Sequence, residues 1–162
     1  MSLADTLSDL AATAGAGALA GLAGTAAMTV SSSLEAKARG REPSATPGRA
    51  AAKVLGVEPT DESSKKRLNT FAHWGYGTSW GAVRGLLDLA GLRGAPAAVA
   101  HLGAVWGGEQ VVLPATGASS PAWRWGGKEV GVDLLHHGVY AAVTSTVYEL
   151  LDPHRRNRRR HP

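Results

Sequence analysis

The stretch TAGAGALAGLAGTAAMTVSSSL, residues 13–34, carries no charged side chain and decides the fold class. A helix of roughly 22 residues can cross the hydrocarbon layer of a membrane, which is about 30 Å thick. Inside a water-soluble helix, glycine costs about 1 kcal/mol relative to alanine. In lipid, small residues four positions apart let two helices approach closely. The stretch therefore predicts a membrane-spanning helix that packs through its glycines.

Three further segments have the length of spanning helices, at about residues 69–89, 97–113 and 130–151. We predict an all-α fold: one integral membrane domain, residues 1–162, with four long helical segments of which three or four span. The third segment is the candidate for a re-entrant one, because it is short and ends at Pro114. Glycines at four-residue spacing predict the helix contacts, and these are Gly17, Gly21, Gly77, Gly81, Gly85, Gly103 and Gly107.

The distribution of charge supports a membrane protein better than the overall composition does. The mean hydropathy of the 162 residues is −0.09, which is low for such a protein. Of the basic residues, however, only Arg84 lies inside a predicted span, whereas the linker 35–68 and the tail 152–162 hold most of the others. A water-soluble helix would carry charges along its outer face. We therefore expect a multi-pass protein of the bacterial inner membrane.

The basic stretches predict contacts with anionic lipid. Each basic residue near such a surface contributes about 1 kcal/mol. In the tail, the residues expected at the headgroups are Arg155, Arg156, Arg158, Arg159 and Arg160. Nucleic acid is not an expected partner, because the tail has no interleaved aromatic residues on which bases could stack. A second copy of the chain or another membrane subunit could pack on unused glycine ridges.

The linker predicts a short helix that begins at Thr46-Pro47, runs through Leu55 and stops at Gly56. Threonine is a good N-cap, and proline suits the first helical turn. Ser63 and Ser64 are the expected caps of the second long helix. Basic stretches follow both the first and the fourth predicted spans, which puts them on opposite faces, so the excess of Lys and Arg does not orient the protein.

Ionisable residues inside the predicted spans are the candidate functional residues. Such groups are costly in a bilayer and usually point into the bundle. The set is His73, Arg84, His101, Glu109, Asp133, His136 and His137, together with Glu129, which directly precedes the last span. Three interpretations remain open: structural hydrogen bonds of about 0.6 kcal/mol each, a proton path, or a metal site. The Asp-x-x-His spacing would place the metal on Asp133, His136, His73, His101 and Glu109.

No chemical motif predicts an enzyme or a resident cofactor. The glycine-rich stretches lack the Gly-Lys-Ser/Thr of a phosphate-binding loop, and the absence of cysteine excludes disulfides, iron–sulfur clusters and thiolate nucleophiles. We expect a non-enzymatic scaffold or accessory subunit that senses or conducts protons. The alternatives are a membrane metalloprotein or metal-dependent enzyme with a divalent metal, and a soluble helical bundle that binds nucleic acid through its arginine tail.

A set of short matches extends over residues 14–151. They are Gly21-Leu22-Ala23-Gly24-Thr25, His73 with Tyr76-Gly77, Pro114 with Gly117, and Glu129-x3-Asp133-x2-His136. In this order the chain resembles the YagU-like family of uncharacterised bacterial inner-membrane proteins. The resemblance implies a multi-pass membrane protein of unknown activity. It marks His73, Glu129 and His136 as matching polar positions and implies no catalytic residue.

Overall fold

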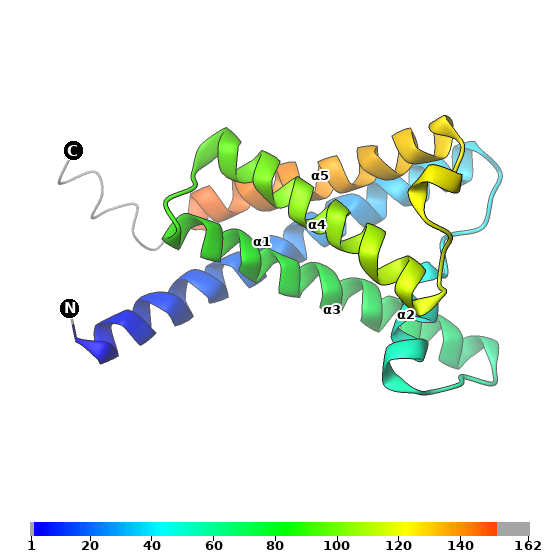
Figure 1. Ribbon diagram of the computed structural model, residues 1–162, viewed down its shortest axis with the longest axis horizontal. Helices are drawn as coiled ribbons and strands as arrows, with labels where there is room; N and C mark the ends of the chain where they lie inside the picture. Colours follow the sequence, from blue (N-terminus) through cyan, green and yellow to red (C-terminus); the bar gives the residue numbers. More distant parts are fainter. Residues whose placement is uncertain (1, 152–162) are drawn as a thin grey trace.

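The computed structural model describes residues 2–151, and these residues form helices and connecting turns without a strand (Figure 1). The elements are α1 (Leu3–Ala38), α2 (Thr46–Leu55), α3 (Glu62–Leu89), α4 (Gly94–Thr116), a short 3-10 helix η1 (Ala122–Arg124) and α5 (Gly127–Leu151). The predicted all-α fold is confirmed. Each of the four long helices begins earlier than the hydrophobic pattern indicates.

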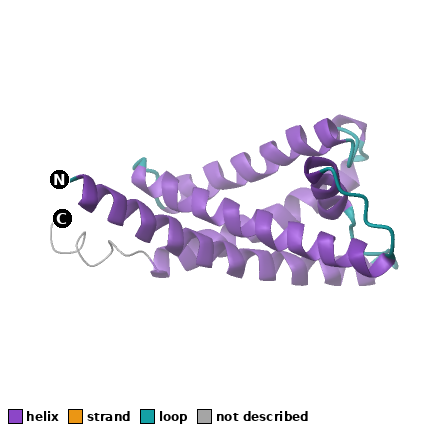
Figure 2. Ribbon diagram, turned by 90° about the horizontal axis from the view of Figure 1, so that it is seen from below, coloured by secondary structure: helices purple, strands orange, loops and turns teal. Residues whose placement is uncertain are grey.

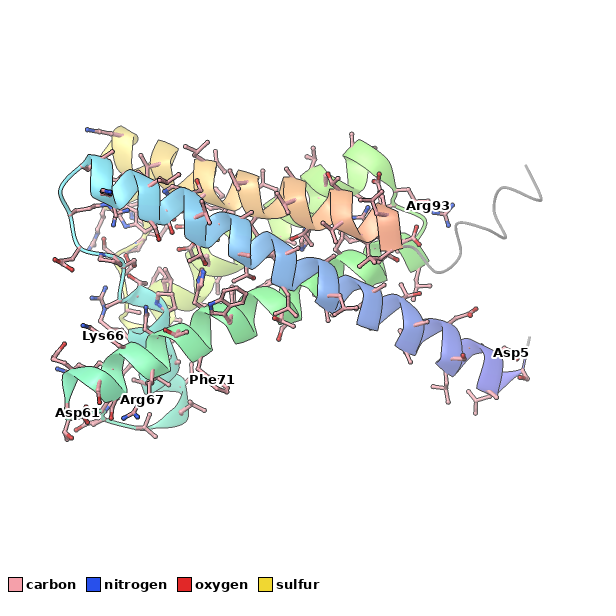
Figure 3. All side chains as sticks on the ribbon, turned by 180° about the vertical axis from the view of Figure 1, so that it is seen from behind. Asp5, Asp61, Lys66, Arg67, Phe71 and Arg93 are labelled. Carbon is pink, nitrogen blue, oxygen red and sulfur yellow. The ribbon has the colours of Figure 1, made fainter. Side chains whose placement is uncertain are left out.

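The four long helices alternate in direction along the long axis of the molecule (Figures 1 and 2). The segment between α1 and α3 lies at one end, which we call the linker end, together with the turn before α5. The turn between α3 and α4 and the start of α1 lie at the opposite end. Figure 3 shows Asp61, Lys66 and Arg67 at the linker end, and Asp5 and Arg93 at the opposite end.

Helices α1 and α3 cross at their glycines. A Cβ atom on Gly21 would lie 2.7 Å from the carbonyl oxygen of Gly77 and 2.8 Å from the Cα of Gly81. Side chains on Gly17 or Gly85 would likewise meet the backbone of the facing helix. Only glycine permits this approach, because each contact is backbone against backbone.

Helix α5 also packs against α1. A Cβ atom on Gly24 would lie 2.9 Å from the carbonyl oxygen of Tyr140. The Tyr140 hydroxyl donates a hydrogen bond of 2.5 Å to the carbonyl oxygen of Gly77, so this residue links α5 to α3. Small and polar residues thus form the centre of the bundle. A separate apolar cluster, Ala50, Leu113 and Ala118, joins α2 to the end of α4.

The ends of the shorter elements follow local chemistry. Helix α2 has Pro47 in its first turn and ends at Gly56, whose φ of 64° is the left-handed conformation that glycine favours. The expected short helix is therefore confirmed, but Thr46 is its first residue and not its N-cap; the N-cap is Ala45, and no side chain caps the helix. The expected caps of α3 are wrong: Asp61 is the N-cap, and its carboxylate accepts a 2.9 Å hydrogen bond from the amide of Ser64. A side-chain acceptor at the N-cap position can bind the amide groups of the first helical turn, which have no partner within the helix.

Membrane spanning is only partly supported by helix composition. Among the residues that the structure describes, one helix, α1, is long and apolar enough to cross a membrane. The prediction of three or four spans is thus not confirmed by this criterion. Helices α3, α4 and α5 have 28, 23 and 25 residues, so polar content rather than length separates them from α1. Helix α4 is continuous through Pro114, so no break marks it as re-entrant.

Candidate functional site

The bundle interior brings together Glu109 of α4 with Asp133 and His137 of α5. One ligand-type atom from each lies within 4.8 Å of the other two. Glu109 Oε2 is 3.0 Å from His137 Nε2, and Asp133 Oδ1 is 3.6 Å from His137 Nδ1. We call these three residues the carboxylate–histidine cluster. They lie between α4 and α5 on the linker-end side of the bundle, because Asp133 falls in the second turn of α5.

Hydrogen bonding determines the tautomer of His137. Its Nδ1 lies 2.9 Å from the backbone carbonyl oxygen of Asp133. A carbonyl can only accept, so Nδ1 carries the proton and Nε2 points toward Glu109. In a neutral ring, Nε2 then carries a lone pair, and this lone pair faces the carboxylate of Glu109. That contact requires a cation, either a second proton on the ring or carboxyl group, or a metal ion.

Trp106 supports the cluster from α4. Its indole Nε1 donates a 2.8 Å hydrogen bond to Asp133 Oδ2. This hydrogen bond could not be predicted from sequence, because a tryptophan inside a helix gives no sign of its partner. The cluster is only partly buried: the side chain of Asp133 is 25% exposed, whereas that of His137 is 9% exposed.

The other predicted metal ligands lie elsewhere in the bundle. His136 faces α1, where its Nδ1 is 2.8 Å from Ser31 Oγ and its Nε2 is 3.7 Å from Glu35 Oε2. His73 Nε2 lies 3.0 Å from Thr29 Oγ1. His101 Nε2 lies 2.9 Å from the carbonyl oxygen of Trp80, and its ring packs 5.6 Å from that of Tyr140. Of the five residues, Glu109 and Asp133 are the two that the structure brings together in this cluster.

A second buried polar group lies nearer the opposite end. Arg84 of α3 is 1% exposed, and its Nε donates a 3.1 Å hydrogen bond to Ser145 Oγ of α5. Its guanidinium lies 4.7 Å from the centre of the Tyr148 ring. Asp88 accepts a 2.6 Å bond from Arg93 and a 3.3 Å bond from the Tyr148 hydroxyl. These contacts join α3 to α5 and compensate charges that would be costly unpaired.

Four charged residues form a network on the surface at the linker end. Arg39 contacts Glu129 at 2.7 Å and Glu35 at 3.0 Å, and Arg41 also pairs with Glu35. Hydrogen bonding to Arg41 and Arg39 lowers the pKa of Glu35 to about 2. Glu129 therefore belongs to this network, which ties α1 to the start of α5.

A serine motif in α3 has no support as a nucleophile. The run Gly77-Thr78-Ser79-Trp80-Gly81 matches the Gly-x-Ser-x-Gly pattern. In hydrolases this pattern sits on a sharp turn between a strand and a helix. Here it lies in the interior of α3, and Ser79 Oγ donates a 2.8 Å hydrogen bond to the carbonyl oxygen of Gly75.

Of the seven glycines predicted to pack helices together, five lie at or beside a helix contact and two do not. Gly17, Gly21, Gly77, Gly81 and Gly85 lie at the contact of α1 with α3 or beside it. For Gly103 and Gly107, no heavy atom of the described residues lies within 4 Å of an added Cβ. The arginines predicted at lipid headgroups, Arg155, Arg156, Arg158, Arg159 and Arg160, fall outside the described residues.

Comparison with protein-family models, with curated proteins and with solved structures gives no match for this chain. The resemblance to the YagU-like family therefore stays a prediction. The geometry of the bundle is what supports a functional interpretation.

Proposed function

We propose that the chain is a multi-pass, non-enzymatic membrane protein in which α1, α3, α4 and α5 cross the bilayer and enclose a cation site. One observation carries this proposal: the distribution of apolar and polar side chains is inverted. Leu19, Val99 and Leu135 are 59%, 69% and 58% exposed, whereas Arg84 and His101 are 1% and 0% exposed. Both kinds of residue occur on the same helices.

Water would make this arrangement costly. Burying a Leu or Val side chain contributes about 1.5–3 kcal/mol, which each exposed residue forgoes. Among the described residues, 18 large hydrophobic residues of α1, α3, α4 and α5 are exposed. Lipid chains contact such residues without that loss, and polar groups in a membrane protein face inward to one another. The inversion therefore supports a surrounding bilayer more strongly than the hydropathy of any single helix does.

The cation site is the carboxylate–histidine cluster. Glu109, Asp133 and His137 are ionisable residues that meet across α4 and α5, and the contact between Glu109 and His137 requires a proton or a metal ion between the two atoms. An accessory subunit that takes up a cation inside the bilayer fits this arrangement. Catalysis is not part of the proposal.

Alkaline carbonate extraction tests the membrane proposal. Membranes from cells that express the full chain are washed with carbonate, which releases proteins held only at the surface. We expect the chain to stay in the pellet and to be released by detergent. Release by carbonate would contradict the proposal. Salt-sensitive binding of DNA by the released chain would then support the soluble, nucleic-acid-binding alternative.

A further inference from the structure

We propose that the carboxylate–histidine cluster binds one divalent transition-metal ion, with Glu109, Asp133 and His137 as its protein ligands. The inference rests on the proposed function, since it names the class of cation held in the bundle. It replaces the ligand set expected from the sequence, because His137 rather than His136 faces the carboxylates.

The spacing of the donor atoms suits a shared ion. Carboxylate oxygens and imidazole nitrogens bind zinc at about 2.0–2.2 Å. Two atoms at that distance from one ion and 3.0 Å apart subtend about 90° at the ion, an ordinary ligand angle. A carboxylate oxygen of Asp133 lies within 4.8 Å of one ligand-type atom of each of the other two residues. Closing the site on one ion requires side-chain rotations that bring this oxygen nearer to Nε2 of His137.

The surrounding hydrogen bonds have the pattern of a supported metal site. A metal-binding histidine usually donates its other N–H to a carbonyl or carboxylate, which sets its tautomer. His137 Nδ1 has this partner in the carbonyl oxygen of Asp133. A ligating carboxylate is usually hydrogen-bonded as well, and Asp133 Oδ2 accepts from the indole of Trp106. Both supports leave Nε2 of His137 and one carboxylate oxygen of Asp133 available.

A proton explains the contact between Glu109 and His137 less well. The two atoms are close, yet Glu109 Oε2 is buried and has no hydrogen-bond partner among the described residues. The separation is that of a hydrogen bond, yet no hydrogen bond joins the two atoms. In addition, a divalent ion neutralises both carboxylates, which one proton does not.

The donor set limits the class of ion. One imidazole and two carboxylates, with no thiolate, favour Zn²⁺, Mn²⁺ or Fe²⁺ over copper(I) or an iron–sulfur cluster. Three protein ligands leave at least one position for water or a substrate atom. The partly exposed side chain of Asp133 marks the side from which the ion enters.

Metal analysis of the full chain in detergent or lipid discs tests the inference. The protein is stripped with a chelator, exposed to excess Zn²⁺, desalted and analysed for bound zinc. We expect about one ion per chain. Glu109→Gln and His137→Gln should each lose it, and Trp106→Phe should weaken Zn²⁺ binding about 10- to 100-fold. His136→Gln is the matched control, because this neighbouring histidine faces α1; it should keep the ion.

The wild-type measurement decides the inference without any variant, so a variant that fails to fold leaves the test intact. A chain that takes up no Zn²⁺ overturns the metal site, and so does equal loss of zinc in His136→Gln and His137→Gln. Retention in carbonate-washed membranes is a separate readout. A retained chain without zinc would overturn the metal site alone, whereas a released chain would overturn the proposed function.

Discussion

Single atoms at the crossing of α1 and α3 determine how closely these helices approach. Gly21 faces Gly77 and Gly81, and the contacts leave no room for a methyl group. Gly103 of α4 has the same residue type and the same helical backbone, but no heavy atom of the described residues within 4 Å of an added Cβ. An alanine substitution at each position therefore distinguishes the effect of tight packing, present only at Gly21, from the effect of helix propensity, present at both.

We expect Gly21→Ala to destabilise the protein by about 1–3 kcal/mol, because the added methyl group forces the two backbones apart. Gly103→Ala, the matched control, should be neutral or slightly stabilising, because alanine is the better helix former. Unfolding in mixed micelles, followed by circular dichroism, measures both. Equal stability of the two variants would contradict the packing described for α1 and α3.

The glycine spacing could be predicted from sequence, whereas the partners of the histidines could not. Periodicity places His136 and His137 on one side of a helix, but successive residues of a helix point about 100° apart. Which of the two faces the carboxylates depends on how α5 is rotated against α1 and α4. That rotation follows from the contact of Gly24 with Tyr140, which involves two helices and is invisible in either segment alone.

At the scale of elements, α2 is held at the linker end by polar contacts. Asn69 of α3 accepts a 2.8 Å hydrogen bond from the amide of Gly48 and donates a 3.1 Å bond to the carbonyl oxygen of Ser44. Arg49 donates to the carbonyl oxygen of Ala118 at 3.1 Å. One side chain, Asn69, thus fastens both the start of α2 and the segment before it.

We expect Asn69→Ala to open the linker, because it removes two hydrogen bonds of about 1 kcal/mol each. Cleavage by trypsin at the basic linker residues should become about 30-fold faster, because about 2 kcal/mol changes an opening equilibrium by that factor. Thr70→Ala is the control, since its exposed hydroxyl bonds only within α3, to the carbonyl oxygen of Lys66. Unchanged cleavage of the Asn69 variant would show that α2 is held mainly by other contacts.

Some helix ends can be predicted well from sequence, and capping chemistry explains which ones. Pro47 and Gly56 bracket α2 because each has a fixed backbone preference. The start of α1 lies before the predicted span of residues 13–34, because that span is defined by hydrophobicity and not by capping residues. Ser2 and Asp5 form a capping box that begins the helix well before the uncharged stretch, and a pattern search for spans does not register it.

At the scale of the whole molecule, the low mean hydropathy argues against a membrane protein, whereas the pattern of buried and exposed side chains favours one. This difference has a physical reason. Mean hydropathy counts every residue equally, so buried Arg84 and His101 lower it as much as surface charges would. The structure separates the two cases: Arg84 and His101 lie inside the bundle, whereas many large apolar side chains, such as Leu19, Val99 and Leu135, lie outside. The sequence could predict four long helices, but the inversion of inside and outside becomes visible only once the helices are packed.

Thiol labelling tests the inverted bundle most directly, because the chain has no cysteine and each variant carries a single thiol. Leu19→Cys and Leu135→Cys replace exposed residues of α1 and α5, and Val54→Cys replaces an exposed residue of α2. In opened membrane fragments, a water-soluble maleimide should label Val54→Cys promptly and leave the other two unlabelled until the protein is dissolved and denatured. Equally fast labelling of all three would show that water surrounds the bundle and would contradict the account.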